Sequence, residues 1–306
     1  SGEKFHKSEY STIDTALCLN GVITAAAYFQ DAEIQEQAQQ LLERVDWNYF
    51  VFERDGKTLL RMAYNPEIGG DYVDGAPGFI SQWDMAAEQK MMYLQAADRL
   101  TPATARALYQ GFPRPVSNFE GQPIIFNPGG NLFAYQFSEA WLDTRSYLDP
   151  DGVDWFNNTR LAALANRAFC IEQSTKYRGY HEKSDSPRGY RVFGAPPCYG
   201  TPEHDGTVSI YSTLACLPFL PEHTLGMVEY LYQYHPQTRG PYGFYDAYNL
   251  DVNPPWYSGA VFGIDKGCSM IMIENYLSGL VWDVYTGSPT IQKALKILGF
   301  TARNGA

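Results

Sequence analysis

The stretch TIDTALCLNGVITAAAYF, residues 12–29, is followed after two residues by AEIQEQAQQLLERVDW, residues 32–47. The first segment is almost entirely apolar, which predicts a helix that is buried all round. The second places Ile34, Leu41 and Leu42 at helical spacing among Glu and Gln, which predicts an amphipathic helix. The sequence therefore begins with an inner helix followed by an outer helix.

This pair of helices recurs along the chain, and Pro102, Pro221 and Pro289 each suit the first turn of an outer helix. The five expected hairpins, inner helix first, are Thr12–Phe29 with Ala32–Trp47, Ile80–Leu100 with Pro102–Tyr109, Asn131–Leu148 with Val153–Gln173, Thr207–Leu217 with Pro221–Tyr234, and Asp265–Tyr285 with Pro289–Leu298. We predict an all-α fold, a toroid of the (α/α)6 kind. Because that toroid has six hairpins, one N-terminal hairpin is expected to be missing before residue 1.

Three segments interrupt the helical pattern. Phe50–Tyr64 reads as a small β-hairpin around the turn dipeptide Asp55-Gly56. The stretches 178–202 and 240–263 are long and rich in Gly, Pro and Tyr, and loops of that length are usually functional. Since both precede an inner helix, we expect them to rim one mouth of the toroid. No linker divides the chain, so residues 1–306 are predicted to form a single domain.

Composition excludes several classes of protein. The net charge is −11 and no cluster of Lys and Arg is present, which argues against binding to nucleic acid. The five cysteines have no C-x-x-C spacing, and the histidines are not paired as H-x-x-x-H, so we expect no disulfide framework, no zinc and no cofactor. No apolar span of about 18 residues and no signal peptide are expected. Aromatic residues make up 15% of the chain, which fits either a large aromatic core or a sugar site.

Acidic residues mark the predicted starts of the inner helices: Asp14, Glu88, Glu139 with Asp143, Asp205 and Asp265. A helix that begins with an acid and continues apolar usually buries its body and presents its start to solvent. The simplest geometry places these acids around one mouth. Carboxylate chemistry in an aromatic-lined cleft is typical of enzymes that cut glycosidic bonds.

Each acid also has a structural interpretation. Asp14 can simply favour a helix start beside a Ser or Thr cap. Arg145 can neutralise one of the acids in the predicted Glu139–Asp143 helix, and Lys266 can pair with Asp265 on the surface.

Spacing on the predicted helices adds a further signal. Asp84 and Glu88 are four residues apart, beside Trp83, and would share one face of a helix. Glu139 and Asp143 repeat that spacing beside Trp141. Two acids on one face are unfavourable unless they are solvated, paired or used to raise a pKa.

The motifs taken together resemble those of the bacterial glycoamylase-like domain, which includes the β-1,2-glucanases of glycoside hydrolase family 144. The segments that carry the resemblance are Ser11–Leu17, Ala140–Asp143, Ser184–Tyr190, Asp205–Ser209, Gly243–Asp246, Gly263–Gly267 and Ile273–Tyr276. The resemblance spans nearly the whole chain in the right order. It implies an (α/α)6 toroid that hydrolyses β-1,2-glucan with inversion and is exported to the periplasm or the cell exterior.

The resemblance also implies roles for three acids. Glu88 is similar to the family's essential glutamate, the general acid, and Trp83 beside it is expected to help raise its pKa. Asp14 is similar to an essential aspartate at the substrate site, and Asp265 to the late aspartate, taken as the base. Asp265 would remove the proton directly or through a relay of a substrate hydroxyl and water. An inverting acid and base lie roughly 6.5–9.5 Å apart, and further apart if such a relay intervenes. The chain departs from the family pattern before Asp14, where a segment is missing and only Glu9 offers a second acid.

The expected ligand is an oligosaccharide or polysaccharide bound by a monomer. The candidate substrate-binding residues are Asp143, Trp83, Trp141, Arg188, Tyr190, Tyr245 and Trp256. Other interpretations are a glucoamylase-like hydrolase of another glucan, a polysaccharide lyase, and a glycan-binding module without activity.

Overall fold

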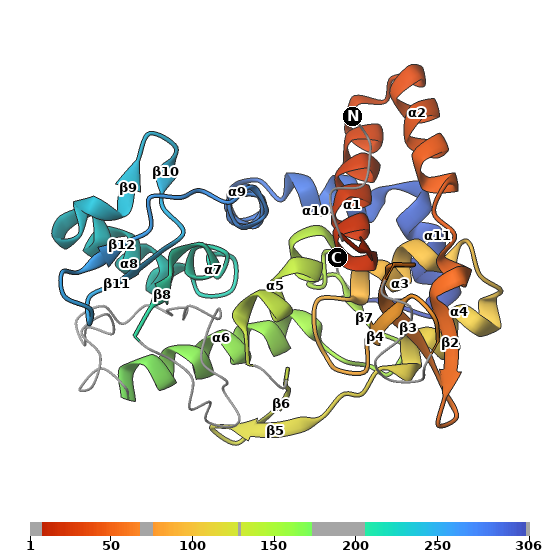
Figure 1. Ribbon diagram of the computed structural model, residues 1–306, viewed down its shortest axis with the longest axis horizontal. Coiled ribbons are helices and arrows are strands. Elements are labelled where there is room, and N and C mark those ends of the chain that lie inside the picture. Colours follow the sequence, from red (N-terminus) through yellow and green to blue (C-terminus); the bar gives the residue numbers. More distant parts are fainter. Residues whose placement is uncertain (1–7, 68–75, 128–129, 173–205, 304–306) are drawn as a thin grey trace. The chain divides into compact units, whose positions relative to one another are not determined.

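The computed structural model describes residues 8–67, 76–127, 130–172 and 206–303, and it is mostly helical with small β-sheets (Figure 1). Contacts along the chain divide it into two compact units. Unit 1 consists of residues 1–113, 149–152 and 283–306, and unit 2 consists of residues 114–148 and 153–282. The prediction of a single domain stays a prediction.

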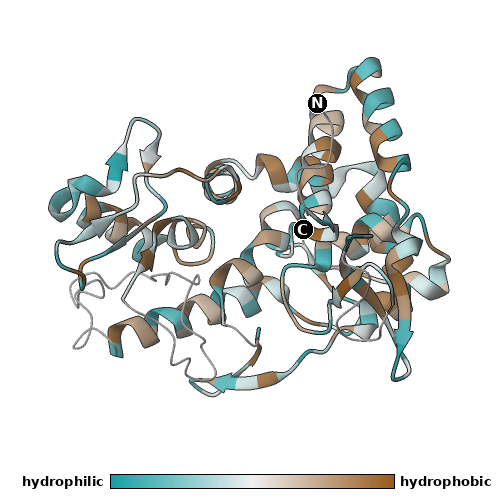
Figure 2. Cartoon of the chain, in the orientation of Figure 1, coloured by the Kyte–Doolittle hydropathy of each residue, from teal (hydrophilic) through white to brown (hydrophobic). Residues whose placement is uncertain are grey.

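Unit 1 combines helical pairs with one four-stranded sheet. Its elements are β1 (Tyr10–Ser11), α1 (Thr12–Phe29), α2 (Ala32–Glu43), the 3₁₀ helix η1 (Trp47–Phe50), β2 (Val51–Arg54), β3 (Lys57–Tyr64), β4 (Phe79–Gln82), α3 (Lys90–Ala97), α4 (Pro102–Gly111), most of α10 (Leu280–Gly287), α11 (Pro289–Leu298) and β13 (Thr301–Ala302). Helix α1 packs against α2 and α3, and α4 and α11 pack against α3. The hydropathy of α2 alternates around its axis, as its amphipathic sequence predicts (Figure 2).

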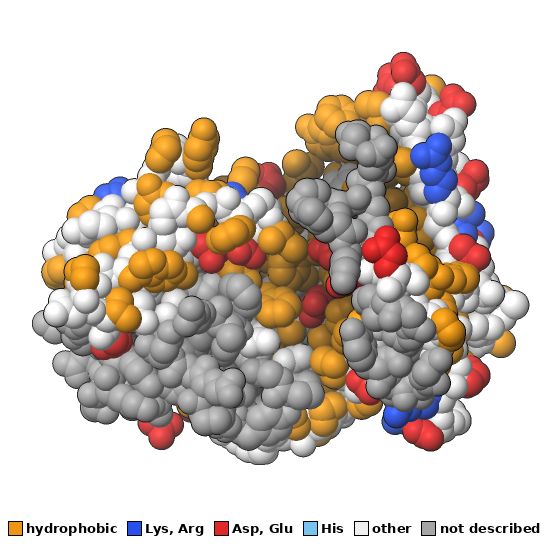
Figure 3. All heavy atoms as spheres, viewed as in Figure 1, with side chains coloured by type: hydrophobic (Ala, Val, Ile, Leu, Met, Phe, Trp, Pro, Cys, Tyr) orange, Lys and Arg blue, Asp and Glu red, His pale blue; other side chains and the backbone are white. Residues whose placement is uncertain are grey.

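Helix α1 differs from its predicted environment, because only part of its surface is covered. Ala16, Leu19 and Ile23 are buried, whereas Tyr28 and Phe29 are 53% and 61% exposed. Apolar side chains are visible over this end of the molecule in the space-filling view (Figure 3). Among the described helices α1 alone has the length and composition to cross a membrane, a property that core helices and signal sequences share. No apolar span of about 18 residues is expected from the sequence, but α1 is one such span.

The predicted β-hairpin is confirmed, and its neighbour corrects one helix. Strands β2 and β3 pair around Asp55 and Gly56, both of which have positive φ. The inner helix predicted over Ile80–Leu100 begins only at Lys90, because Phe79–Gln82 forms strand β4 and pairs with β3. Glu88 therefore lies in a turn before α3, and it shares no helical face with Asp84.

The outer helices begin where the prolines predict. Pro102 and Pro289 follow Thr101 and Ser288, whose side chains accept hydrogen bonds from backbone N–H groups of the first turn. Helix α8 likewise begins at Pro221. A fixed proline φ and a capping hydroxyl are local signals, so these boundaries follow from sequence alone.

Unit 2 consists of helices and short strands. Its elements are β5 (Val116–Phe119), β6 (Gln122–Ile125), α5 (Leu132–Trp141), β7 (Tyr147–Leu148), α6 (Trp155–Glu172), β8 (Val208–Ser209), α7 (Ile210–Leu214), α8 (Pro221–Tyr234), the 3₁₀ helix η3 (Pro236–Thr238), β9 (Arg239–Gly240), β10 (Gly243–Phe244), β11 (Ala247–Asn249), β12 (Trp256–Tyr257) and α9 (Gly263–Leu277), with the start of α10. One apolar cluster joins α6, α7, α8 and β11 through Cys170, Ile210, Leu231 and Tyr248.

Unit 2 corrects three expectations. The small sheets were not predicted, so the fold is mostly helical rather than all-α; strands of two to four residues are too short to show a period of two. Helix α5 ends at Trp141, so Asp143 lies beyond it. The helix predicted over Asp265–Tyr285 is two helices, because the chain turns at Ser278 and at Gly279, whose φ is +75°.

Candidate active site

The start of α1 is fixed to the sheet of unit 1 through Thr12. The Thr12 hydroxyl lies 2.7 Å from the Met62 carbonyl and 3.1 Å from the Arg61 carbonyl. The indole N–H of Trp83 donates to the same hydroxyl at 3.1 Å. The buried Thr12 hydroxyl therefore links the start of α1 to strand β3 and to Trp83.

Asp14 lies in the first turn of this fixed helix, and its side chain is exposed. The Ser11 hydroxyl caps the helix by accepting a hydrogen bond from the Asp14 backbone N–H at 3.3 Å. The predicted cap is thus supplied by Ser11. The carboxylate of Asp14 does not serve as the cap, which leaves it at the exposed start of the helix.

Glu88 occupies a turn that is pinned by the side chain of the next residue. The Gln89 amide oxygen accepts from the Ala87 N–H at 2.8 Å, and its NH₂ group donates to the Met85 carbonyl. Gln89 is itself fully buried. The carboxyl group of Glu88 is therefore presented by a rigid turn, although the sequence predicts a helix there.

Burial raises the pKa of Glu88 to about 7. A backbone hydrogen bond and the charge of Lys90 lower this pKa, while the charge of Asp14 raises it further. The structure thus brings Asp14 and Glu88 close enough to interact electrostatically. A carboxyl group that is about half protonated at neutral pH is suited to donate a proton.

Trp83 is buried in the core of unit 1, with 5% of its surface exposed. Its contact with Thr12 supports the start of α1. Its predicted role in substrate binding stays a prediction.

Asp265 lies in the first turn of α9 and is buried. It lines a small pocket of unit 2, with room for about one water molecule. The other residues that line the pocket are Tyr211, Leu214, Phe244, Tyr245, Asp246, Val261, Phe262 and Lys266. Asp265 is therefore not the surface acid that pairing with Lys266 would make it, since the Lys266 ammonium donates to the Phe244 carbonyl at 2.8 Å.

Burial also raises the pKa of Asp265 to about 7. A hydrogen bond to the Asp246 side chain and the charge of Asp246 raise it as well, whereas a hydrogen bond with Tyr211 lowers it. Asp246 and Tyr211 were not among the predicted site residues. The motif Gly243–Asp246 was the one available signal, but nothing local links it to Asp265.

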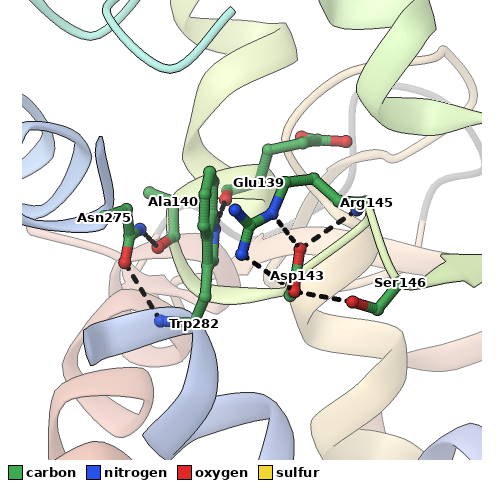
Figure 4. A network of polar contacts seen from close by, with 7 residues as sticks. All are labelled: Glu139, Ala140, Asp143, Arg145, Ser146, Asn275 and Trp282. Atoms are coloured by element: carbon green, nitrogen blue, oxygen red, sulfur yellow. Dashed lines mark hydrogen bonds and ion pairs between the residues drawn. The ribbon is translucent and has the colours of Figure 1, made fainter. Parts of the chain in front are cut away.

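Asp143 is held within unit 2 by its own turn (Figure 4). Its Oδ1 accepts from Arg145 Nε at 2.8 Å, and its Oδ2 accepts from Arg145 Nη2 at 3.1 Å and from the Ser146 hydroxyl at 2.8 Å. The Arg145 guanidinium lies 4.0 Å from the centre of the Trp282 ring. The structural interpretation, neutralisation by Arg145, therefore holds for Asp143, and its predicted contact with sugar hydroxyls stays a prediction.

The same network joins the ends of three helices. The Trp282 indole N–H donates to the Glu139 carbonyl at 2.6 Å, and Asn275 donates from its amide to the Ala140 carbonyl at 2.8 Å (Figure 4). Glu139 is fully buried in α5, and Trp141 is the half-buried last residue of that helix. Glu139 therefore does not face solvent as an acid at a helix start would.

Two predicted aromatic residues lie at accessible positions in unit 2. Tyr245 lines the pocket of Asp265, and its ring crosses so close to Gly240 that a Cβ there would lie 2.5 Å from the tyrosine oxygen. Trp256, in β12, is 47% exposed. Arg188, Tyr190 and Asp205 lie outside the described residues.

Among the described residues no group of three His, Cys, Asp or Glu side chains is arranged to hold a metal ion.

The protein is mostly helical, and two of its carboxyl groups, those of Glu88 and Asp265, have raised pKa values. The family profile described as "Putative glucoamylase" matches residues 80–289, which is more than half of the sequence. The chain therefore belongs to the glycoamylase family, and the resemblance seen in the motifs is confirmed.

Known relatives connect this family with β-1,2-glucan. The chain is 25% identical over 322 residues to an exo-β-1,2-glucooligosaccharide sophorohydrolase (non-reducing end) of Parabacteroides distasonis, covering 93% of this chain and 42% of the relative. It is 25% identical to the endo-β-1,2-glucanase of Chitinophaga pinensis solved with sophorotriose and glucose, with a TM-score of 0.78 over 95% of this chain and 71% of the other. A "putative glucoamylase" of Bacteroides fragilis is 27% identical, with a TM-score of 0.77 over 96% and 71% of the two chains. The chain thus spans less than half the length of the curated relative that it matches.

Proposed function

We propose that this chain hydrolyses β-1,2-glucan. The observation that carries the proposal is the pair of carboxyl groups, Glu88 and Asp265, whose pKa values are each raised to about 7. Both groups lie within the span matched by the family profile, and relatives of the chain act on β-1,2-linked glucans.

In the proposed mechanism Glu88 donates its proton to the glycosidic oxygen as the bond to the leaving sugar breaks. Asp265 removes a proton from the water that attacks the anomeric carbon, and the configuration is inverted. A pocket with room for about one water molecule suits a base, because it admits the nucleophile. Asp14, exposed and close enough to raise the pKa of Glu88, is proposed to bind a sugar hydroxyl.

The proposal extends to the architecture and the substrate subsites. The helical hairpins are proposed to belong to one (α/α)6 toroid within a single domain. The protein is proposed to be a monomer. Trp256, with almost half of its surface exposed, is a candidate stacking platform for a glucose ring, and Tyr245 is a candidate subsite wall. Export to the periplasm or cell exterior is also proposed, because the motifs resemble those of a family whose members tend to be exported.

Product analysis tests the proposal. The protein is incubated with β-1,2-, β-1,3- and α-1,4-glucans, and the released sugars are separated by chromatography. We expect sophorose or longer β-1,2-linked products from the first glucan only. The Glu88→Gln variant is expected to lose activity by about 10²–10⁴-fold, the contribution of general acid catalysis.

The other outcomes identify the competing functions. Release of glucose from the α-1,4-glucan would indicate a glucoamylase, and an ultraviolet-absorbing unsaturated product from a uronate polymer would indicate a lyase. Binding of a glucan without release of sugar would indicate a glycan-binding module. Near wild-type hydrolysis by Glu88→Gln would remove Glu88 from the mechanism.

A further inference from the structure

Asp246 is held beside Asp265 by its backbone. Its N–H donates to the Ala260 carbonyl at 3.3 Å, and its carbonyl accepts from the Ile210 N–H at 2.9 Å. These bonds tie the residue to the start of α7 on one side and to the segment that leads into α9 on the other. The carboxyl group of Asp246 is therefore fixed on the wall of the pocket that Asp265 lines.

One oxygen of the Asp246 carboxyl group, beside Asp265, lacks a hydrogen-bond donor among the described residues. Within the described part of the chain, Oδ1 of Asp246 is buried and accepts no hydrogen bond from an ordinary donor. A buried acceptor without a donor is costly, by about 1–3 kcal/mol. A proton on the neighbouring Asp265 carboxyl would supply the missing donor, because the two side chains lie within hydrogen-bonding reach.

Tyr211 approaches the pair from α7. Its side chain hydrogen-bonds Asp265. Burial, and then the charges of Asp265 and Asp246, raise its pKa, so it stays a neutral donor. Helix α7 is fixed to α9 by Ser269, whose hydroxyl lies 3.3 Å from the Tyr211 carbonyl and 3.0 Å from the Asp265 carbonyl.

The remaining titratable groups around Asp265 are few. Lys266, in the same helix, and Tyr245 line the same pocket. Burial lowers the pKa of Lys266, and the charge of Asp246 opposes that shift. Burial raises the pKa of the Cys268 thiol, with a further contribution from Asp265. Asp246 is thus the acidic neighbour that hydrogen-bonds Asp265 among the described residues.

We propose that Asp246 is a positioning residue for Asp265: the two carboxyl groups share one proton, and this hydrogen bond holds Asp265 toward the pocket and sets the pH at which it becomes a base. Two adjacent carboxyl groups lose their protons in two steps that belong to the pair, because like charges side by side disfavour the second ionisation. The catalytic consequence rests on the proposed function of Asp265, whereas the shared proton does not.

The test compares Asp246→Asn and Tyr211→Phe. Asparagine keeps the shape and can donate to Asp265, but removes the repulsive charge. The acidic limb of the kcat/KM pH profile on β-1,2-glucan, which reports ionisation of the base, is then expected to move down by about one pH unit. Tyr211→Phe removes a donor that favours the ionised carboxylate, so the same limb is expected to move up.

Glu229→Gln is the matched control. It removes one negative charge from an exposed position on α8 in the same unit, and the pH profile is expected to stay unchanged. A purely structural role of Asp246 would lower activity without moving the limb. An unchanged limb, or a shift upward, in folded Asp246→Asn would overturn the proposal.

A second measurement needs neither activity nor a folded Asp246 variant. The side-chain carboxyl carbons are labelled with ¹³C-Asp, and their NMR signals are followed from pH 3 to pH 9 in the wild type and in Asp265→Asn. We expect one signal of the wild type to titrate near pH 7 and to disappear in Asp265→Asn. If both carboxyl groups of the wild type titrate independently in the ordinary acidic range, the proton is not shared. If the signal near pH 7 is present but no glucan is cleaved, the proposed function fails and the shared proton stands.

Discussion

At the level of single residues, Glu88 and Asp265 owe their raised pKa values chiefly to burial. Burial disfavours the charged form of a carboxyl group. The surrounding fold must therefore stabilise each of these two groups. For Glu88 the nearby charges oppose each other, because Lys90 lowers the pKa and Asp14 raises it. Ionisation of such a buried carboxyl group lowers the stability of the folded protein.

The pH dependence of stability tests the state of Glu88. Its folded pKa, about 7, lies above the ordinary value of 4.5, so the folded protein binds more protons than the unfolded chain between these values. The stability due to protonated Glu88 is complete below pH 4.5 and is lost as the pH rises to about 7. In Glu88→Gln, the free energy of unfolding from urea titrations is expected to fall less between pH 5 and pH 8, by up to roughly 3 kcal/mol. Parallel pH profiles for the two proteins would contradict the raised pKa.

At the level of elements, the turn before α3 positions Glu88. Strand β4 pairs with β3 up to Gln82, and the chain then reaches Lys90 through a turn bonded to the Gln89 side chain. A helix is predicted here from the local sequence. It does not form before Lys90, because β4 pairs with β3 and the Gln89 side chain holds the turn. The carboxyl group is therefore carried by a rigid turn at the start of a buried helix.

Gln89→Ala tests this turn. The substitution leaves the Ala87 N–H and the Met85 carbonyl without their partner, which is expected to cost about 1–3 kcal/mol of stability. Since Glu88 is then less well placed, kcat on β-1,2-glucan is expected to fall at least tenfold while KM changes little. Gln37→Ala, which removes an exposed amide from α2, is the control and should leave both constants unchanged. Wild-type kcat in a destabilised Gln89→Ala would show that the turn does not position the acid.

Elements with local signals were predictable, and those that depend on pairing were not. Helices α4, α8 and α11 begin at prolines, and the turn at Asp55-Gly56 fixes the hairpin of β2 and β3. Strand β4, and strands β8 and β11 of unit 2, depend on partner segments that lie further away along the chain. Their sequences carry no period long enough to reveal this pairing.

At the level of the whole molecule, the two carboxyl groups belong to different compact units, Glu88 to unit 1 and Asp265 to unit 2. The proposed mechanism uses one carboxyl group from each unit. Neither unit alone carries both an acid and a base with raised pKa values among the described residues.

The stereochemistry of the product tests this division of roles. If Glu88 acts only as the acid and Asp265 only as the base, water replaces the leaving sugar in a single displacement, and the product appears as the α-anomer. Proton NMR of the first product, recorded before mutarotation, is expected to show this inverted configuration. A β-anomer as first product would require a carboxylate nucleophile and would exclude the proposed mechanism.

The sequence by itself determined the starts of α4, α8 and α11 and the family, and it supplied the candidates Asp14, Glu88 and Asp265, because proline positions, capping residues and motif order are local properties. Only the tertiary structure decided which acids are buried and which are neutralised. It shows Asp143 bound by Arg145 and Ser146, Glu139 enclosed in α5, and Asp265 placed against Asp246 and Tyr211. A carboxyl pKa depends on burial and on neighbours that are distant along the chain, so no reading of one segment alone could supply it.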